Sequence, residues 1–376
     1  MLLQSFVLRA GITLRRLFDS TLGSKQVAQY ERGDSMLSTP KIASSLVLVA
    51  ATLVIQEPNA VGQGQASLGE PLFSFGAPIH ETHFNLIWDY CLSSGDTLYI
   101  LDRREREVTA FHLSGEQLLS FGNRGMGPGE FEDPNSLYFS DHCVFVGDHG
   151  IPRITRFTSE GEYLHTITLP NLPHTFVVID DIIYMSTPAT SRAIIWKISL
   201  MNPERAEPYL TFDHPLVSQY KDKLPHGRIM IDAKGTSLCI AMPVHNAVII
   251  GDVNTDTADW RLIHPNGSNI DEHRDHFAGV KREVERRGAG TSWSPFRRAI
   301  ILPDGNIFLE MIMWKDGDSR GIGIIIDPQS GEQISGELTP QYSKSYIARL
   351  LRDNLIGFVY HDLEQLTLYN FPPENS

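Results

Sequence analysis

A pattern of short apolar runs in this chain returns after 46 residues. Each run alternates apolar and polar residues, and Gly, Asp or Pro separates one run from the next, which is typical of short β-strands joined by tight turns. The residues that correspond at this spacing are Phe75 and Phe121, Tyr99 and Phe145, Asp102 and Asp148, Phe111 and Phe157, and Gly115 and Gly161. A strand repeat of this length restricts the fold more than any single motif, because each repeat must be one structural unit that stacks on the next.

The recurring residues fit the four-stranded blade of a β-propeller. Tyr99 and Phe111 are broad apolar side chains of the kind that fills the space between neighbouring twisted sheets. Asp102 closes a strand and can accept hydrogen bonds from backbone amides of the next turn, while Gly115 permits a tight hairpin. The repeat therefore predicts an all-β propeller in which each unit of 46 residues is one blade.

A known family carries a similar set of residues. The residues that match are Gly122, Gly125, residues 127–129, Phe131, Pro134, Asp148, Arg153, Ile154, Phe157 and Gly161. They resemble the NHL-type repeat of six-bladed β-propellers, over about residues 68–169. Beyond that range only the spacing of the strands continues. The resemblance implies a six-bladed ring and implies less about activity, because one propeller fold serves many functions.

Residues 1–66 differ from the rest and are expected to form a leader. Residues 42–55 are an uncharged run of 14 residues. This is short for a membrane-spanning helix of about 20 residues and fits the apolar core of a signal peptide. Cleavage is expected near Ala66, and translation from Met36 instead of Met1 would give the peptide an ordinary length. The alternative is an uncleaved N-terminal membrane anchor, and in both cases the body of the protein is exported.

Composition argues against a general nucleic-acid binder and against a metal site built from cysteines. The formal net charge is −13, and no basic block is apparent, which argues against a general nucleic-acid binder because binding phosphate needs a basic surface. Cys91, Cys143 and Cys239 are an odd number and lack the spacing of a metal site. We expect them to be buried small hydrophobic residues, without a disulfide framework.

Residues 67–376 are expected to form six blades. Blades one and two cover residues 84–121 and 131–169. The strands expected later are residues 174–179, 182–186, 193–198 and 209–212 in blade three, 228–232, 237–242, 247–252 and 259–263 in blade four, 297–302, 306–313, 321–327 and 332–338 in blade five, and 345–351, 355–360 and 365–371 in blade six. Blade six lacks one strand, and residues 71–76 are expected to supply it and to close the ring.

Residues 264–295 do not follow the repeat and are expected to form a helical insertion between blades four and five. Acidic residues at 271–272 and basic residues at 286–287 fit the two ends of a helix. The insertion should lie over the face where inner strands begin, as a lid, a docking element or a solvated segment without a role. His273 and His276 share one face of this helix, but without a third ligand we interpret them as exposed histidines.

The positions where inner strands enter the centre of the ring are the candidate binding site. Counting ten residues back from the aromatic residue of the second strand, or its equivalent, gives Asp89, Asn135, His174, Arg228 (or Ile229), Arg298 and Tyr346. Only Asp89 and Asn135 suit a metal ion, and the two arginines would repel one. The set fits an anionic or sugar-like ligand held by arginine forks. The alternative is a set of polar residues that merely line a water-filled channel.

The sequence therefore predicts a monomeric, exported binding or interaction module, periplasmic or extracellular, which recognises a small anionic or sugar-like molecule or a peptide at the central channel. Two alternatives stay open: a metal-assisted hydrolase or lyase on the same fold, and a structural scaffold for a protein partner. No catalytic residue, metal ligand or cofactor is assigned. The glycine-rich residues 122–129 lead into a strand and not a helix, so they are expected to connect blades and not to bind phosphate.

Overall fold

A computed structural model of the chain describes residues 72–76, 83–187, 193–221, 229–265, 296–315, 318–337, 345–352, 355–360 and 364–370. All of them belong to one compact unit. The expected leader and nearly all of the expected helical insertion, residues 266–295, lie outside the described residues.

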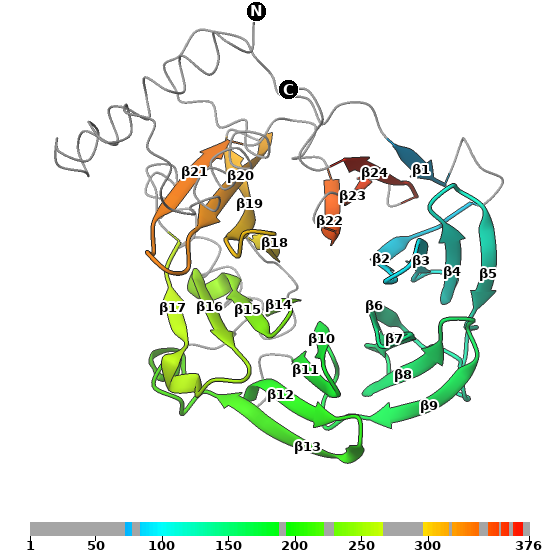
Figure 1. The fold of residues 1–376 in the computed structure, drawn as a ribbon, viewed down its shortest axis with the longest axis horizontal. Coiled ribbons are helices and arrows are strands. Elements are labelled where there is room, and N and C mark those ends of the chain that lie inside the picture. Colours follow the sequence, from blue (N-terminus) through cyan, green and yellow to red (C-terminus); the bar gives the residue numbers. More distant parts are fainter. Residues whose placement is uncertain are drawn as a thin grey trace, which may run out of the picture. The chain divides into compact units, whose positions relative to one another are not determined.

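The described strands form six antiparallel sheets of four strands each (Figure 1). Blade one is β2 (Ile87–Leu92), β3 (Thr97–Asp102), β4 (Glu107–His112) and β5 (Gln117–Phe121), and blade two is β6 (Pro134–Ser140), β7 (Cys143–Asp148), β8 (Arg153–Thr158) and β9 (Tyr163–Thr168). Blade three is β10 (Phe176–Ile179), β11 (Ile182–Ser186), β12 (Ala193–Ser199) and β13 (Asn202–Thr211), and blade four is β14 (Met230–Lys234), β15 (Ser237–Met242), β16 (Ala247–Asp252) and β17 (Arg261–Ile263). Blade five is β18 (Phe296–Ile301), β19 (Ile307–Lys315), β20 (Asp318–Ile326) and β21 (Gln333–Glu337), and blade six is β22 (Ser345–Arg352), β23 (Leu355–Tyr360), β24 (Leu366–Asn370) and β1 (Phe73–Phe75). The predicted six-bladed propeller with four-stranded blades is confirmed.

The first strand of each blade lies at the centre of the ring. These inner strands, β2, β6, β10, β14, β18 and β22, each contact the inner strands of the blades on either side, β22 and β2 included (Figure 1). Side chains from six distant parts of the sequence therefore converge at the centre of the ring.

Blade six combines the earliest described strand with the last three. Phe73 of β1 pairs with Leu368 of β24, and Phe75 pairs with Leu366. The ring of Phe75 is buried and lies 5.1 Å from that of Phe111 in blade one. The strand thus contributes both to the sheet of blade six and to the packing against blade one.

Large apolar side chains separate neighbouring blades. Phe145 is fully buried in a cluster with Phe176 of blade three. Phe157 is buried in a different cluster, where its ring centroid lies 4.7 Å from that of Phe121 in blade one. The two residues lie on strands of the same blade but pack against opposite neighbours. The burial between blades that is expected for the repeated aromatic residues is confirmed at both positions.

Two of the repeated glycines are required by both backbone and space. Gly115 and Gly161 have φ values of +95° and +80°, in the left-handed region that favours glycine. A Cβ atom on Gly115 would lie 1.9 Å from the ring of Phe73, and one on Gly161 would lie 2.8 Å from the ring of Phe121. Each hairpin thus fits against the outer strand of the preceding blade, which explains why glycine recurs at the repeat spacing.

Helical structure in the described part of the chain is limited to three short 3-10 turns. These are η1 (Ser218–Tyr220), η2 (Pro243–His245) and η3 (Thr257–Asp259). Over the same residues, no helix has the length and apolar character needed to cross a membrane.

Candidate functional site

Carboxylates on two inner strands bind backbone amides of the following blade. Asp89 on β2 accepts a 2.7 Å hydrogen bond from the backbone amide of Leu137 on β6. Asp232 on β14 accepts one of 2.7 Å from the backbone amide of Ile301 on β18. Each side chain therefore joins two adjacent blades at the centre of the ring.

Neutral polar residues make the same kind of connection between blades two, three and four. The Nδ2 atom of Asn135 donates to the carbonyl oxygens of Pro173 and His174, at 3.1 and 3.3 Å. The hydroxyl of Ser186 donates to the carbonyl oxygen of Ile229 at 3.0 Å. Asn135 therefore uses its amide to join two blades.

Asp89 and Asn135 do not occupy equivalent places in their blades, which corrects the count that selected them. Asp89 pairs with Leu101 on the second strand. In blade two Ser136 takes that place, paired with Gly147, and Asn135 lies in a one-residue register shift. Blade one has the same register shift, at Trp88, so the two blades differ in the turn that follows: it is one residue longer between Leu92 and Leu98 than between Phe139 and Val144, the equivalent pair in blade two. A fixed count along the sequence therefore selects different faces of the inner strand in different blades.

Arg349 on β22 lies at the centre of the ring and is absent from the predicted set. Its Nη1 atom donates to the carbonyl oxygens of Tyr90 and Leu137, at 2.6 and 3.0 Å, and lies 3.3 Å from the Asp89 carboxylate. It thus links blades six, one and two. Its Nε and Nη2 atoms have no partner among the residues that the structure describes, and its side chain is 28% exposed.

The neighbours of Arg349 keep it charged. Burial by itself lowers the pKa of Arg349, but Asp89, Cys91 and Asp232 together raise the pKa above its ordinary value. The guanidinium therefore offers a permanent positive charge, and its Nε and Nη2 donors form the planar fork that matches a carboxylate.

Asp89 and Arg349 form an ion pair, and Tyr138 and Asp232 are further partly exposed side chains on inner strands whose pKa responds to the charge of Arg349; we call these four residues the central cluster. Burial raises the pKa of Asp232, and the Ile301 amide and the charge of Arg349 offset this only in part. Burial, followed by the charge of Asp232, raises the pKa of Tyr138 to about 12. The cluster combines one guanidinium, two carboxylates and a phenol. Their charges affect one another's pKa, and all four side chains are partly exposed to solvent.

His174 belongs to a row of side chains at the edge of the ring where inner strands begin. Its ring stacks on that of His149, with centroids 5.6 Å apart. Asp133, just before β6, accepts two hydrogen bonds of 2.6 Å from Arg103, whose guanidinium lies 4.2 Å from the ring centre of Trp88. The hydrogen bonds from Arg103 hold the pKa of Asp133 below its ordinary value. The row lies on blades one to three.

The other predicted site residues are only partly placed. Arg228 lies outside the described residues. The backbone of Arg298 pairs with that of Glu310, and Tyr346 lies in a register shift of β22, but their side chains lie outside the description. Of the predicted set, the structure brings Asp89 into the central cluster and places Asn135 and His174 at the junction of blades two and three. Arg349 was missed because the count ended at Tyr346, although a lone arginine in the apolar run 346–351 was a signal.

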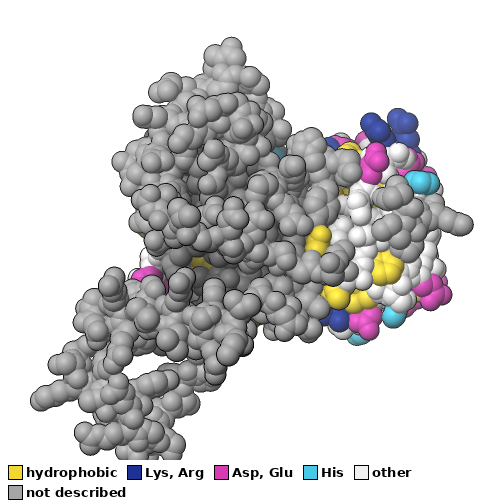
Figure 2. All heavy atoms as spheres, turned by 90° about the horizontal axis from the view of Figure 1, so that it is seen from above, with side chains coloured by type: hydrophobic (Ala, Val, Ile, Leu, Met, Phe, Trp, Pro, Cys, Tyr) yellow, Lys and Arg dark blue, Asp and Glu magenta, His cyan; other side chains and the backbone are white. Residues whose placement is uncertain are grey.

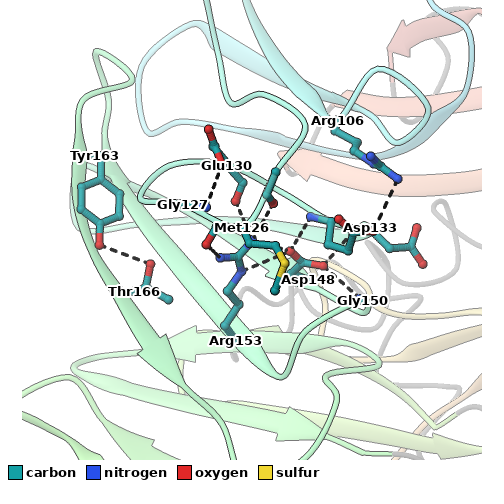
Figure 3. Close-up of polar contacts among 12 residues, drawn as sticks. Arg106, Met126, Gly127, Glu130, Asp133, Asp148, Gly150, Arg153, Tyr163 and Thr166 are labelled. Atoms are coloured by element: carbon teal, nitrogen blue, oxygen red, sulfur yellow. Dashed lines mark hydrogen bonds and ion pairs between the residues drawn. The ribbon is translucent and has the colours of Figure 1, made fainter.

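The glycine-rich connector into blade two is held by a buried ion pair (Figure 3). Arg153 and Asp148 lie 2.9 Å apart, with side chains 8% and 0% exposed. Arg153 also donates to the carbonyl oxygens of Met126 and Glu130, at 3.1 and 2.8 Å. The Glu130 carboxylate accepts a 2.8 Å hydrogen bond from the amide of Gly127. These residues hold the connector in one conformation and leave Met126, which is 72% exposed, at the surface.

Three leucines at the repeat spacing are exposed on the outer strands of successive blades. Leu72, Leu118 and Leu164 are each 46 residues apart and are 51%, 46% and 43% exposed. We call them the rim leucines. Figure 2 shows hydrophobic side chains (yellow) beside acidic and basic ones on the coloured part of one face of the molecule. The rim leucines are therefore exposed apolar side chains that occupy the same position in three successive blades.

The cysteines are buried and unpaired. Cys91, Cys143 and Cys239 are all free thiols, as the sequence predicted. Burial raises the pKa of Cys91, which disfavours the reactive thiolate. In the part of the chain that is described, no group of three or more His, Cys, Asp and Glu side chains is arranged to hold a metal ion.

Comparisons with known proteins identify the fold. No protein-family model matches the sequence. No curated protein matches it either. Among solved structures, a DUF4221-family protein from Bacteroides vulgatus is 10% identical, with a TM-score of 0.53 over 80% of this chain and 97% of its own. A Bacteroides fragilis protein described as exported is 12% identical, with a TM-score of 0.48 over 77% of this chain and 94% of its own. Virginiamycin B lyase from Staphylococcus aureus is 11% identical, with a TM-score of 0.48 over 79% of this chain and 98% of its own. At such identities the likeness concerns the fold alone.

Proposed function

We propose that this protein is an exported binding module whose central channel holds a small molecule through an anionic group, with Arg349 as the anchor. The observation that carries the proposal is the Arg349 guanidinium. Its Nη1 atom is fixed by the carbonyl oxygens of two other blades, while Nε and Nη2 have no partner in the described chain. A fork of donors fixed in this way before binding loses little freedom when a carboxylate arrives.

The experiment is a calorimetric titration of the full chain with propionate, benzoate, succinate, L-alanine, inorganic phosphate and glucose. We expect saturable binding of at least one carboxylate. Arg349→Gln should weaken it about tenfold or more, a loss of about 1.4 kcal/mol that one charge-assisted contact readily accounts for. Arg352→Gln is the matched control, because Arg352 lies on the same strand but pairs with the exposed Asp96 at 2.9 Å. Binding of no carboxylate, or equal binding by Arg349→Gln, overturns the proposal.

A metal-assisted hydrolase or lyase is less well supported by the residues at the centre. Asp89, on which such a site would depend, already accepts hydrogen bonds from the amides of Tyr90 and Leu137, at 2.9 and 2.7 Å, and lies 3.3 Å from Arg349. A hard cation would have to displace the arginine from this carboxylate.

A scaffold for a protein partner is the second candidate, and the rim leucines favour it. Exposed leucines at one repeated position suit a partner with an apolar contact surface. Leu118→Glu with Leu164→Glu should then abolish a defined complex without affecting channel binding. Met201→Glu, at a site 83% exposed in blade three, is the control. Equal complex formation by both variants would remove this candidate.

Several finer features belong to the same proposal. We infer that blades one and two are NHL-type repeats, which the Asp148–Arg153 pair supports for blade two. We infer that β1 closes the ring, which its pairing with β24 supports. We infer that residues 42–55 are removed on export by cleavage near Ala66, and N-terminal sequencing of protein recovered outside the cytoplasm tests it. A mature chain that keeps residues 42–55 would indicate a membrane anchor instead.

A further inference from the structure

Each rim leucine is the last residue of a sequence Gly-Glu-x-Leu, which we call the rim motif. It reads Gly-Glu-Pro-Leu at residues 69–72, Gly-Glu-Gln-Leu at 115–118 and Gly-Glu-Tyr-Leu at 161–164. The first of the three glutamates lies outside the described residues, while Glu116 and Glu162 are exposed like the leucines that follow them. An acidic and an apolar side chain therefore recur together on the outer strands, once in each of these blades.

Two of the rim leucines occupy β-bulges. Leu118 lies in the register shift of β5, where Gln117 and Leu119 pair with consecutive residues of β4. Leu164 lies in the equivalent shift of β9. Blade five reaches a Gly-Glu sequence, residues 331–332, through a longer turn, and its β21 pairs with β20 without a shift. A blade can therefore be built without this bulge, and bulges are a common device for re-aiming a side chain.

The rim motifs of successive blades lie against one another. The outer strands β1, β5 and β9 follow one another around the outside of the ring (Figure 1). A Cβ atom on Gly161 would lie 3.1 Å from Cδ1 of Leu119, the residue after Leu118, and Gly115 lies in the same way against Phe73 of β1. The acidic turn of each blade therefore lies against the strand that carries the rim leucine of the preceding blade.

The glutamates of the rim motifs are not neutralised by the described part of the chain. The carboxylates of Glu116 and Glu162 have neither a hydrogen-bond partner nor an ion-pair partner among the described residues. Glu160, in the same turn as Glu162, is exposed and adds a further negative charge. Unpaired carboxylates beside apolar side chains are complementary to a partner that carries basic residues beside apolar ones. They would repel the surface of an anionic membrane.

We propose that the outer edge formed by β1, β5 and β9 binds a segment of another protein in which Lys or Arg residues lie beside Leu, Ile or Val residues. The apolar residues of that segment contact the rim leucines, and its basic residues pair with the glutamates of the rim motifs. This inference rests on the scaffold candidate of the proposed function, since it assigns the charge and the residue pattern of the partner. It does not depend on Arg349 or on the central channel.

The test selects binders from a phage-displayed library of random dodecapeptides. Peptides that bind the chain with Leu118→Ser and Leu164→Ser are removed first, so that those which then bind the wild type need the rim leucines. We expect the enriched peptides to carry Lys or Arg beside an apolar residue. Glu116→Gln with Glu162→Gln should weaken binding of their synthetic copies about tenfold or more. Added salt should also weaken it, because salt screens exposed charges.

Met201→Ser with Glu204→Gln is the matched control. It also removes an exposed apolar and an exposed acidic side chain from the edge of blade three, outside the rim motifs. This variant should bind the peptides as the wild type does. All substituted side chains are exposed, so each variant should remain folded, and circular dichroism checks this.

The outcomes separate this inference from the scaffold candidate. If no peptide is left after the removal step, both fall. If the remaining peptides lack basic residues, or bind equally to Glu116→Gln with Glu162→Gln, the basic partner is wrong while the scaffold candidate stands. If the control variant loses binding as strongly as the glutamate variant, general surface charge and not the rim motif accounts for binding, and the inference is also wrong. None of these results bears on carboxylate binding at Arg349.

Discussion

Side chains at the centre of the ring hold neighbouring blades together through backbone groups. Asp89 and Asp232 each accept an amide of the next blade, and Arg349 donates to carbonyls of two blades. Backbone amides and carbonyls cost free energy when they are buried without a partner. Polar residues on the inner strands therefore serve the structure even where no ligand binds, and the ligand binding that we propose at Arg349 would use the donors that this role leaves over.

Asp232→Asn is expected to raise the thermal midpoint at neutral pH. Burial raises the pKa of Asp232 in the folded state above its unfolded value, so the ionised carboxylate destabilises the fold. That penalty is absent at acidic pH, where the carboxyl group is protonated in both states. The gain of the variant should therefore be largest near pH 7, shrink as the pH falls through the raised pKa of the folded state, and vanish below the ordinary pKa of the unfolded state. Midpoints measured across this range by circular dichroism check it, and a gain that grows on acidification would contradict it.

Arg153→Met is expected to destabilise the fold by about 3 kcal/mol, because removal of one partner leaves a buried charge uncompensated. The partner is Asp148, whose side chain is fully buried. Chemical denaturation measures the loss. Arg205→Met is the control, since Arg205 pairs with Glu207 on an exposed strand with side chains 76% and 54% exposed. Equal stability of the two variants would show that the ion pair does not hold the connector.

At the scale of the element, each blade is a sheet whose two faces pack against different neighbours. Phe145 faces blade three and Phe157 faces blade one, although both lie in blade two. Successive side chains along a strand point to opposite faces, which gives every blade two apolar surfaces. The clusters between blades are therefore the core of this protein.

Phe145→Ala and Phe157→Ala should each cost about 3 to 5 kcal/mol, as other large-to-small changes in cores do. The two side chains are 0% and 2% exposed. Because they lie in separate clusters, the losses should be nearly additive in the double variant. Urea unfolding of both single variants and the double variant is the measurement. Losses below about 1 kcal/mol at both sites would mean that these contacts do not carry the packing.

The sequence predicted the blades well because every blade needs the same local packing and turns, so aromatic, aspartate and glycine residues recur at a fixed spacing. Gly115 and Gly161 each have a positive φ and lie against a phenylalanine side chain of the preceding blade, so only glycine fits there. Their spacing in the sequence therefore gives the spacing of the blades. The central cluster could not be predicted in the same way. Inner strands carry register shifts at Trp88, Asn135 and Tyr346, and the turn after the inner strand differs by one residue between blades one and two; no residue type marks either feature. The ion pair of Asp89 with Arg349 joins strands far apart in the sequence.

At the scale of the whole ring, blade six joins strands from both ends of the described chain. β1 pairs with β24, and inner strand β22 contacts β2 of blade one. Arg349 adds hydrogen bonds from blade six to blades one and two. We propose that these contacts close the ring, which would avoid the free sheet edges of an open array.

Deletion of residues 68–76 is expected to reduce stability far more than loss of an ordinary surface strand. It leaves β24 without its outer neighbour and removes the buried ring of Phe75 from the boundary with blade one. Differential scanning calorimetry of the deleted and complete chains gives the comparison. An unchanged thermal midpoint would show that β1 is dispensable for closing the ring.

Native mass spectrometry of the protein purified from the cells that make it and from their medium is the most direct test of the proposed ligand binding at the centre of the ring. We expect the wild-type chain to carry a small molecule that contains a carboxylate and to release it on unfolding. The Arg349→Gln chain should be recovered folded and without that molecule, and the Arg352→Gln chain should retain it. A wild-type chain that carries nothing even after incubation with the carboxylates named above, or an Arg349→Gln chain that retains the same molecule, would contradict the assignment of Arg349 as the anchor of a ligand.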